Sequence, residues 1–306
     1  MTVKWAIGID GGGTKTAALC QTVRKGLPLR RSESGPCNIA AMDIVEASAN
    51  IDRCVESLSI DSKDVSSLCI GVAGYSAVEK RRQFINLVRS RYPSAAVEVA
   101  PDYLIAHSGA FPEGSGVIVI AGTGSIAYGV NPIGESAVVG GYGYLIDDQG
   151  TGYGLGRSVL AAAGKTFDGT GGAEILTRLF IDKTGITTRE ALIAEVYGGR
   201  LDRLTIASFA PLVTEAAAAG DQYADSLLMH AGGALARVAQ SAVVRLFAEN
   251  ETVPVARVGG LWSAGGELSD VFERSLQRAC KSVVFVPPSV APAEGALNRA
   301  LAAVPR

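Results

Sequence analysis

The chain has 306 residues, a net charge of −2, 48% hydrophobic residues and 19% charged residues. This composition provides for a sizeable core and argues against disorder, and the length favours two domains. The near-neutral charge argues against nucleic-acid binding as the main task, and no apolar run approaches the roughly 20 residues of a membrane helix.

Cysteine usage points to a reducing compartment. The five cysteines are scattered and form no CxxC pair, so neither a zinc site nor a disulfide framework is indicated. The N-terminus has no basic segment followed by a signal-type apolar stretch, because a core strand is expected to begin at Val3. We therefore expect a cytoplasmic protein without a membrane partner.

The stretch from Gly8 to Thr16, GIDGGGTKT, carries the first chemical signal. An apolar run from Val3 to Ile9 precedes it, and small and β-branched residues follow from Thr16 to Val23. The pattern predicts two strands joined by a glycine turn. Glycines let a backbone approach a ligand closely and bend through positive φ, and successive free N–H groups form a nest for an anion.

This turn is a candidate phosphate site made of Gly11, Gly12, Gly13, Thr14 and Lys15. Asp10 stands at its mouth, where a carboxylate can hold a divalent metal. It is not a dinucleotide fingerprint, because Thr16 occupies the place of the last glycine, nor a Walker loop, because Thr14 intervenes before the lysine. An ordinary glycine hairpin remains the alternative reading of these residues.

The next elements alternate strands and helices. We expect a strand over Leu27–Ser34, a loop containing Asn38, and a helix capped by Asp43 that runs to about Leu58. Further elements are a strand over Leu68–Ala73, a helix over Val78–Arg91 and a strand over Val97–Ala100.

Asp102 stands at the end of that last strand, just before a helix expected to start around Tyr103. Ligands of open α/β sheets gather at the carboxyl ends of the strands, so Asp102 is a candidate functional residue. The spacing alone is equally that of an N-cap aspartate.

A second glycine turn resembles the first. A strand is expected over Gly116–Ala121, followed by Gly122, Thr123, Gly124 and Ser125 and a strand over Ile126–Val130. The repeated pattern suggests two similar halves, each with a phosphate-binding turn.

The segment from Gly134 to Gly156 mixes glycines with aromatic and acidic residues, among them Tyr142 and Asp148. Flat aromatic faces and acceptor oxygens suit a sugar, whereas a long irregular loop is the plainer interpretation. The chain then reads as mostly helical from Thr151 to Asn250.

The C-terminal part returns to strands. Expected here are a strand over Val255–Val258, the turn Gly259-Gly260, a helix over Glu267–Lys281, a strand over Val283–Val286 and a last helix over Ala293–Ala303.

Taken in order, these motifs resemble the phosphate 1, phosphate 2 and adenosine elements of the actin, Hsp70 and hexokinase superfamily. GIDGGGTKT, the Asp102 segment, AGTGS and GGYGYLIDDQGTGYGLGR are similar to the BadF/BadG/BcrA/BcrD ATPase family, and most of all to its N-acetylglucosamine and glucosamine kinases. The resemblance implies an α/β fold of two actin-like (ribonuclease H-like) domains with a cleft between them. Their expected bounds are 1–115, with 290–306 packing back on it, and 116–289, with a helical insertion.

The resemblance also implies an ATP-dependent transfer to the 6-hydroxyl of an amino sugar, with Mg²⁺ as cofactor. It makes Asp102 the catalytic base and gives Asp10 a contact to the metal, either direct or through water. Sugar contacts are implied for Asn38, Tyr142, Gly143 and Asp148. ATP contacts are implied for both glycine turns and for Gly259 and Gly260.

Departures from the family pattern leave the sugar open. Tyr142 stands where N-acetylglucosamine kinases often carry Trp, and Asp147-Asp148-Gln149 replaces Gly-Asp-Glu. N-acetylglucosamine, glucosamine and N-acetylmuramic acid are all retained as candidate acceptors, and a homodimer is expected because family members often form one.

Two other functions fit the same family and superfamily. Redox-activating ATPases of this family hold an iron–sulfur cluster with cysteines beside the phosphate turns, but Ala121 to Ser125 contains none. Sugar-sensing repressors carry a helix-turn-helix ahead of the first turn, for which Met1 to Ala6 is too short.

Overall fold

The computed structural model describes residues 3–304 except 25–27, 148 and 265. The chain divides into two compact units, residues 1–114 with 287–306 and residues 115–286. Each unit contains one five-stranded mixed sheet, so the α/β class expected from the sequence is confirmed. The cleft expected between the domains stays a prediction.

The first unit is built on the sheet order β3-β2-β1-β4-β5. The strands β1, β2 and β3 pair antiparallel, and β1, β4 and β5 pair parallel. Their bounds are Trp5–Gly11, Thr16–Thr22, Arg30–Ser34, Val65–Val72 and Ala96–Pro101. The helices are α1 (Ile44–Ser57), α2 (Val78–Arg91), α3 (Asp102–Ala110) and α11 (Pro292–Ala302), with a 3₁₀ turn over Ser62–Asp64.

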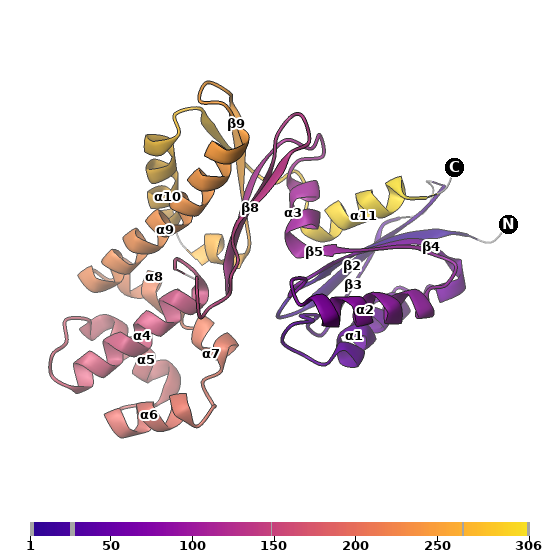
Figure 1. Ribbon diagram of the computed structural model, residues 1–306. Coiled ribbons are helices and arrows are strands. Elements are labelled where there is room, and N and C mark those ends of the chain that lie inside the picture. Colours follow the sequence, from indigo (N-terminus) through magenta and orange to yellow (C-terminus); the bar gives the residue numbers. More distant parts are fainter. Residues whose placement is uncertain (1–2, 25–27, 148, 265, 305–306) are drawn as a thin grey trace. The chain divides into compact units, whose positions relative to one another are not determined.

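Helices cover both faces of this sheet (Figure 1), and β1 alternates between them. Trp5, Ile7 and Ile9 join the core beneath α1 and α2. Ala6 packs with α3 and α11 on the other face. Since side chains alternate along a strand, Gly8 and Asp10 belong to the α3 face.

The second unit repeats this topology with the order β8-β7-β6-β9-β10. Again a three-stranded antiparallel meander is followed by two parallel strands. The bounds are β6 Gly116–Ala121, β7 Ser125–Val130, β8 Ser136–Gly140, β9 Val253–Val258 and β10 Val283–Val286. The two similar halves expected from the repeated turn are therefore present in the topology.

Among the described residues, six α-helices lie between β8 and β9, where the first unit has α1 and the 3₁₀ turn over Ser62–Asp64. Their bounds are α4 Gly152–Phe167, α5 Glu174–Thr184, α6 Arg189–Tyr197, α7 Arg203–Ala207, α8 Ala210–Ala218 and α9 Gln222–Leu246. A 3₁₀ turn over Gly260–Ala264 and α10 (Gly266–Ala279) follow β9. Apolar faces of these helices form one core with the sheet, as their helical spacing predicts.

Helix α9 is long and apolar enough to cross a membrane by length and composition alone, and half of its apolar window is buried inside the protein. Glycines and polar residues interrupt it, so it is not a continuous apolar run. The mostly helical reading of 151–250 is confirmed.

The glycine-rich segment 134–156 is not one irregular loop, so that interpretation is wrong. Ser136–Gly140 forms β8, which pairs antiparallel with β7, and α4 starts at Gly152. The glycines around β8 concealed the strand in the sequence, because glycine is typical of loops. In the structure, Gly140 and Gly141 both adopt positive φ and end the strand.

Gly8 lies where α11 crosses β1. A Cβ at this position would lie 2.0 Å from the backbone nitrogen of Leu297 and 2.5 Å from the carbonyl oxygen of Ala293. The glycine is thus required by packing, because it lets the two backbones touch.

Gly8→Ala is therefore expected to lower the melting temperature, by an amount matching about 1–3 kcal/mol of overpacking. Gly13→Ala is the matched control, because the nearest atom to its Cβ is Asn38 Nδ2 at 3.9 Å. Thermal unfolding of both variants checks this, and equal melting temperatures would contradict the packing argument.

Candidate active site

The first glycine turn joins β1 to β2 in register, with Gly11 opposite Thr16. The Gly12 N–H donates to the Lys15 carbonyl at 2.9 Å and closes the turn. Within the described part of the chain, the N–H groups of Gly13, Thr14 and Lys15 donate no hydrogen bond. Three successive free donors are what an anion nest requires, and phosphate binding at this turn stays a prediction.

The geometry of this turn corrects one expectation. None of Gly11, Gly12 and Gly13 adopts positive φ, so the bend does not need left-handed backbone. Close contact is the constraint instead: a Cβ on Gly11 would lie 3.0 Å from Cys37 Cβ, and one on Gly12 would lie 3.2 Å from the Lys15 carbonyl oxygen.

Lys15 supplies the positive charge of the turn and is paired in this structure. Its Nζ lies 2.6 Å from Glu33 Oε1 on β3, and both side chains are largely in solvent. An exposed ion pair is worth little, so an anionic ligand in the turn can take Lys15 from Glu33.

Asp10 and Asp102 occupy the same edge of the first sheet. Gly11 pairs with Val72, and Val72 with Pro101, so β1, β4 and β5 end in one row. Asp10 precedes the end of β1 on the α3 face, and Asp102 is the first residue of α3. Gly71 stands beside Asp10 in the register, and Ile105 of α3 occupies the space that a side chain at Gly71 would need.

Asp102 is not the N-cap of α3, as its spacing alone suggested. Pro101 occupies the capping position, and Asp102 is the first helical residue. Its Oδ1 accepts the N–H of Tyr103 at 2.9 Å. The carboxylate therefore sits on the positive end of the helix without performing the standard cap.

Both carboxyls are harder to ionise than ordinary aspartates. Burial, and then the neighbouring charge of Asp102, raise the pKa of Asp10 from 3.8 to about 6, against an opposing effect of Lys15. Burial raises the pKa of Asp102 to about 6 as well, although the backbone N–H groups of Tyr103 and Asp102 lower it. At neutral pH both are ionised, and each is a better proton acceptor than an exposed aspartate.

Asn38 lies next to the first turn. It bridges to Ala73 at the end of β4, and its Nδ2 is the nearest neighbour of the space beside Gly13. Its Oδ1 accepts the N–H groups of Ala40 and Ala41 at 3.1 and 3.3 Å. The acceptor end of the amide is thus occupied, which leaves Nδ2 to donate to a ligand.

The second turn has the same construction one residue shorter. The Gly122 N–H donates to the Gly124 carbonyl at 2.9 Å, and Ala121 pairs with Ser125 across β6 and β7. The start of α4 packs on this turn, because Gly152 N–H donates to the Gly122 carbonyl at 2.7 Å. The N–H groups of Thr123 and Gly124 donate no bond among the described residues.

Gly259 and Gly260 lie beside this second turn within the same unit. Gly259 adopts φ +109°, and a Cβ there would lie 2.3 Å from the Ala121 carbonyl oxygen. Gly260 is exposed with no heavy atom within 4 Å of an added Cβ. The pair provides a bare backbone surface next to the turn.

Comparison with known proteins identifies the family. The model of the BadF/BadG/BcrA/BcrD ATPase family matches residues 7–300. The chain belongs to the BadF/BadG/BcrA/BcrD ATPase family.

Individual relatives cover nearly the whole chain. The N-acetylmuramic acid/N-acetylglucosamine kinase of Clostridium acetobutylicum is 32% identical over 278 residues, 90% of each chain. The N-acetyl-D-glucosamine kinase of Dictyostelium discoideum is 30% identical over 312 residues, 96% of this chain and 97% of that one. A Chromobacterium violaceum crystal structure, provisionally assigned as an N-acetylglucosamine kinase, superposes with TM-score 0.78 at 28% identity, covering 97% and 99%. The expected pair of actin-like domains is thereby confirmed.

In this member of the BadF/BadG/BcrA/BcrD family, the sugar-loop candidates lie between β8 and α4. Tyr142 is 72% exposed, and Gly143 adopts φ +90°. Asp148 lies outside the described residues. Tyr142 borders a cavity of about 280 Å³, together with Asp147 and Gln149 of the same loop and Arg237 of α9. No sequence pattern marks Arg237, since the helical spacing of α9 is explained by core packing.

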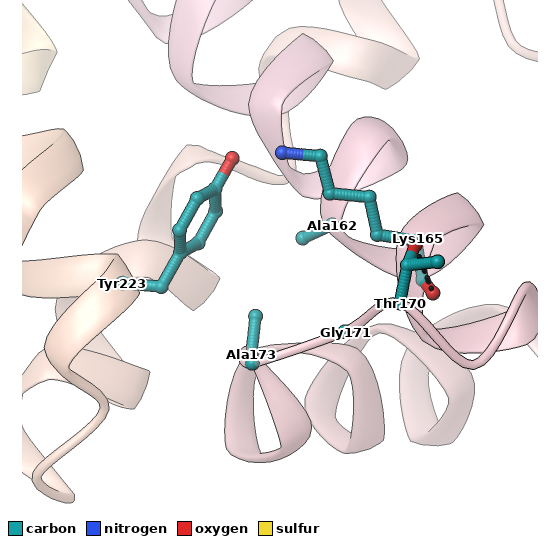
Figure 2. A pocket seen from close by; sticks show the side chains of 7 residues that line it. Ala162, Lys165, Thr170, Gly171, Ala173 and Tyr223 are labelled. Atoms are coloured by element: carbon teal, nitrogen blue, oxygen red, sulfur yellow. Dashed lines mark hydrogen bonds between the residues drawn. The ribbon is translucent and has the colours of Figure 1, made fainter.

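A larger cavity, about 310 Å³, contains none of the predicted site residues. Lys165 of α4 and Tyr223 of α9 face each other across it (Figure 2), with the ammonium 5.5 Å from the ring centroid. Thr170 and Gly171 also line it, and Thr170 Oγ1 donates to the Lys165 carbonyl (Figure 2). Cavity size therefore does not mark the candidate active site in this chain.

The cysteines give no support to the redox-activating alternative within this family. All five are buried, and burial raises the pKa of Cys37 and Cys69 to about 12. A cluster shared between subunits needs thiolates that reach the surface.

The raised pKa values predict how stability depends on pH. Between about pH 3.8 and 6 the folded chain binds more protons at Asp10 and Asp102 than the unfolded chain. The free energy of unfolding therefore falls as pH rises through this window and stays lowered above it. Asp102→Asn, which mimics the protonated form, should melt a few degrees higher than wild type at pH 7.5, and the gain should shrink towards pH 4.

Asp43→Asn is the control for that measurement, because it replaces an exposed N-cap of α1 and Asn caps equally well. A melting temperature of Asp102→Asn below that of wild type at pH 7.5 would show that the Asp102 carboxylate stabilises the fold.

Gly12→Val tests the first turn. Its branched side chain would enter the space held open beside the Lys15 carbonyl. We expect the variant to fold and to lose ATP affinity by about tenfold or more, since the free N–H groups would no longer reach a phosphate. Calorimetry measures this, and unchanged affinity in the folded variant would remove the turn from the site.

Proposed function

We propose that the protein is an ATP-dependent hexosamine kinase that transfers the γ-phosphate of ATP to the 6-hydroxyl of N-acetylglucosamine or glucosamine. The observation that carries the proposal is Asp102, a partly buried carboxylate with pKa about 6 at the edge where β1, β4 and β5 end. The relatives that match nearly the whole chain are amino-sugar kinases, which supports the same reaction.

Asp102 acts as general base. It takes the proton of the sugar hydroxyl as the oxygen attacks phosphorus, and ADP leaves with the bond between its terminal oxygen and the γ-phosphorus broken. The helix that begins at Asp102 fixes the carboxylate, because Oδ1 is held by the Tyr103 N–H. The other oxygen is left to accept the proton.

The two glycine turns, one in each unit, bind the phosphates through backbone N–H groups, with Lys15 adding charge in the first. Gly259 and Gly260 pass close to the adenosine. Asn38 Nδ2 donates to a sugar hydroxyl, and Tyr142, Gly143 and Asp148 complete the sugar contacts. These roles are carried over from the family motifs onto the matching residues.

Mg²⁺ fits this site as an ion held mainly by phosphate and water. No cluster of three or more possible metal ligands occurs among the described residues, which suits a cation that uses one or two carboxylates. Asp10 is the residue that would hold it, directly or through water. Bound Mg²⁺ supplies neutralisation of phosphate charge during transfer. We further expect a cytoplasmic homodimer.

A coupled assay of ADP release tests the function. Wild type is offered glucose, glucosamine, N-acetylglucosamine and N-acetylmuramic acid under saturating ATP and Mg²⁺. We expect an amino sugar to give the highest kcat/KM, because the relatives that support the assignment act on amino sugars. Comparable values for glucose would contradict the hexosamine assignment.

Asp102→Asn separates binding from chemistry. Asn keeps the hydrogen bond to the Tyr103 N–H but cannot accept the proton, so kcat should fall roughly 10²–10⁴-fold, the usual worth of a general base. Sugar and nucleotide affinities should change only modestly. A kcat within a few-fold of wild type would make Asp102 a structural residue and direct the search for the base to Asp147 and Asp148.

A further inference from the structure

Lys80 of α2 is attached to the loop that carries Asn38. Its Nζ donates to the carbonyl oxygens of Ala40 at 3.1 Å and Met42 at 3.2 Å. The loop is far from Lys80 in the sequence, so these two bonds connect a helix to a segment that no strand pairing holds beyond Asn38 and Ala73.

The same loop folds back on Asn38. Besides the two N–H groups on Oδ1, the Asn38 carbonyl accepts the N–H groups of Ala41 and Met42, both at 3.1 Å. Lys80 then occupies the carbonyls of Ala40 and Met42. The Oδ1 and carbonyl of Asn38 and the carbonyls of Ala40 and Met42 are thus all occupied, whereas the Asn38 Nδ2 donates no bond within the described structure.

Gly74, which follows β4, allows the loop that carries Asn38 to pack closely against the end of that strand. It adopts φ +76°, and a Cβ there would lie 2.5 Å from Asn38 Oδ1 and 2.6 Å from the Ala40 nitrogen. The end of β4, the loop and Lys80 therefore form one packed unit around the amide.

The ammonium of Lys80 has no carboxylate within ion-pair distance among the described residues. Its neighbour Glu79 pairs with Arg82 one turn along α2. A charged donor makes stronger hydrogen bonds to carbonyl oxygens than a neutral one, and the Lys80 residue is half-buried.

We propose that Lys80 is a positioning residue for substrate binding: it fixes the loop 38–42 so that the Asn38 amide presents Nδ2 to the sugar. The inference rests on the proposed function, since it needs Asn38 to contact the acceptor. Lys80 itself touches no reacting atom.

Lys80→Met keeps the stem and removes both hydrogen bonds. We expect its KM for the best amino sugar to rise about tenfold or more, because the lost bonds are charge-assisted, while KM for ATP and the melting temperature change little. Lys80→Arg should restore most of the sugar KM. If Lys80→Met does not fold, Lys80→Gln replaces it, since it retains one donor.

Arg82→Met is the matched control. It removes a surface ion pair from the same helix without any contact to the loop, and its sugar KM should equal that of wild type. Hydrogen exchange gives a second readout: the amides of Ala40, Ala41 and Met42 should exchange faster in Lys80→Met than in Arg82→Met.

A double-mutant cycle identifies the route of the effect. Asn38→Ala should itself raise the sugar KM, and adding Lys80→Met in that background should change it less than about twofold, because the residue through which Lys80 acts is gone. Fully additive effects would contradict the inference.

The outcomes separate the two claims. If wild type phosphorylates amino sugars and Lys80→Met retains the wild-type sugar KM, the positioning role is wrong and the proposed function stands. If wild type phosphorylates no amino sugar, the proposed function is wrong and the positioning role falls with it.

Discussion

Two carboxyl groups held away from water at one sheet edge are the constraint on which this account depends. Asp10 and Asp102 each have a pKa raised to about 6, mainly by burial. Keeping both ionised at neutral pH destabilises the folded state, and their mutual repulsion adds to this. A fold that retains such a destabilising pair must be stabilised by its other interactions. Ionisable groups with shifted pKa values of this kind are typical of catalytic sites.

The surrounding packing explains how the pair is held. Gly8 lets α11 lie directly on β1. Gly71 has no side chain, so Ile105 of α3 packs against its backbone, and the helices on this face approach the sheet closely. That approach brings the start of α3, and with it Asp102, to the edge where Asp10 stands. The glycines on this face of the sheet thus determine where Asp102 lies, because they determine how closely the helices pack.

The repeated topology accounts for the two turns. In each unit an antiparallel hairpin closes in a glycine-rich turn where two or three successive N–H groups donate no bond to any described residue, and a parallel strand follows beside the first strand. The units differ in what lies between the meander and that parallel strand: in the described part of the chain, one α-helix and a 3₁₀ turn in the first unit, and six α-helices in the second.

Much of this was predictable from local patterns. The strand Gly116–Ala121, the helix Val78–Arg91 and the strand Val283–Val286 were predicted with their observed bounds, because apolar runs and charged periodicity are strong signals. The two turns followed from glycine content. Strand β8 was missed because glycines flank it, and the position of Asp102 inside α3 was missed because a capping and a first-turn aspartate look alike in sequence.

Other features could not be predicted because they are tertiary. Lys80 contacts a loop some forty residues earlier in the chain, and no pattern within α2 marks it. Arg237 borders the cavity beside Tyr142 from a helix that reads as pure core. The pKa of Asp10 likewise depends on burial and on Asp102, neither of which its own segment reveals.

The central claim is most directly tested by titrating the carboxyl groups of the ligand-free protein. The aspartates are labelled with ¹³C, and their carboxyl resonances are monitored by NMR as the pH changes. The account predicts two resonances that titrate with apparent pKa about 6, one lost in Asp10→Asn and the other in Asp102→Asn. The remaining resonance of the pair should titrate lower in Asp102→Asn, since a neighbouring charge is gone. If every aspartate resonance titrates close to the ordinary value of 3.8, the buried pair does not exist and Asp102 is not a tuned base.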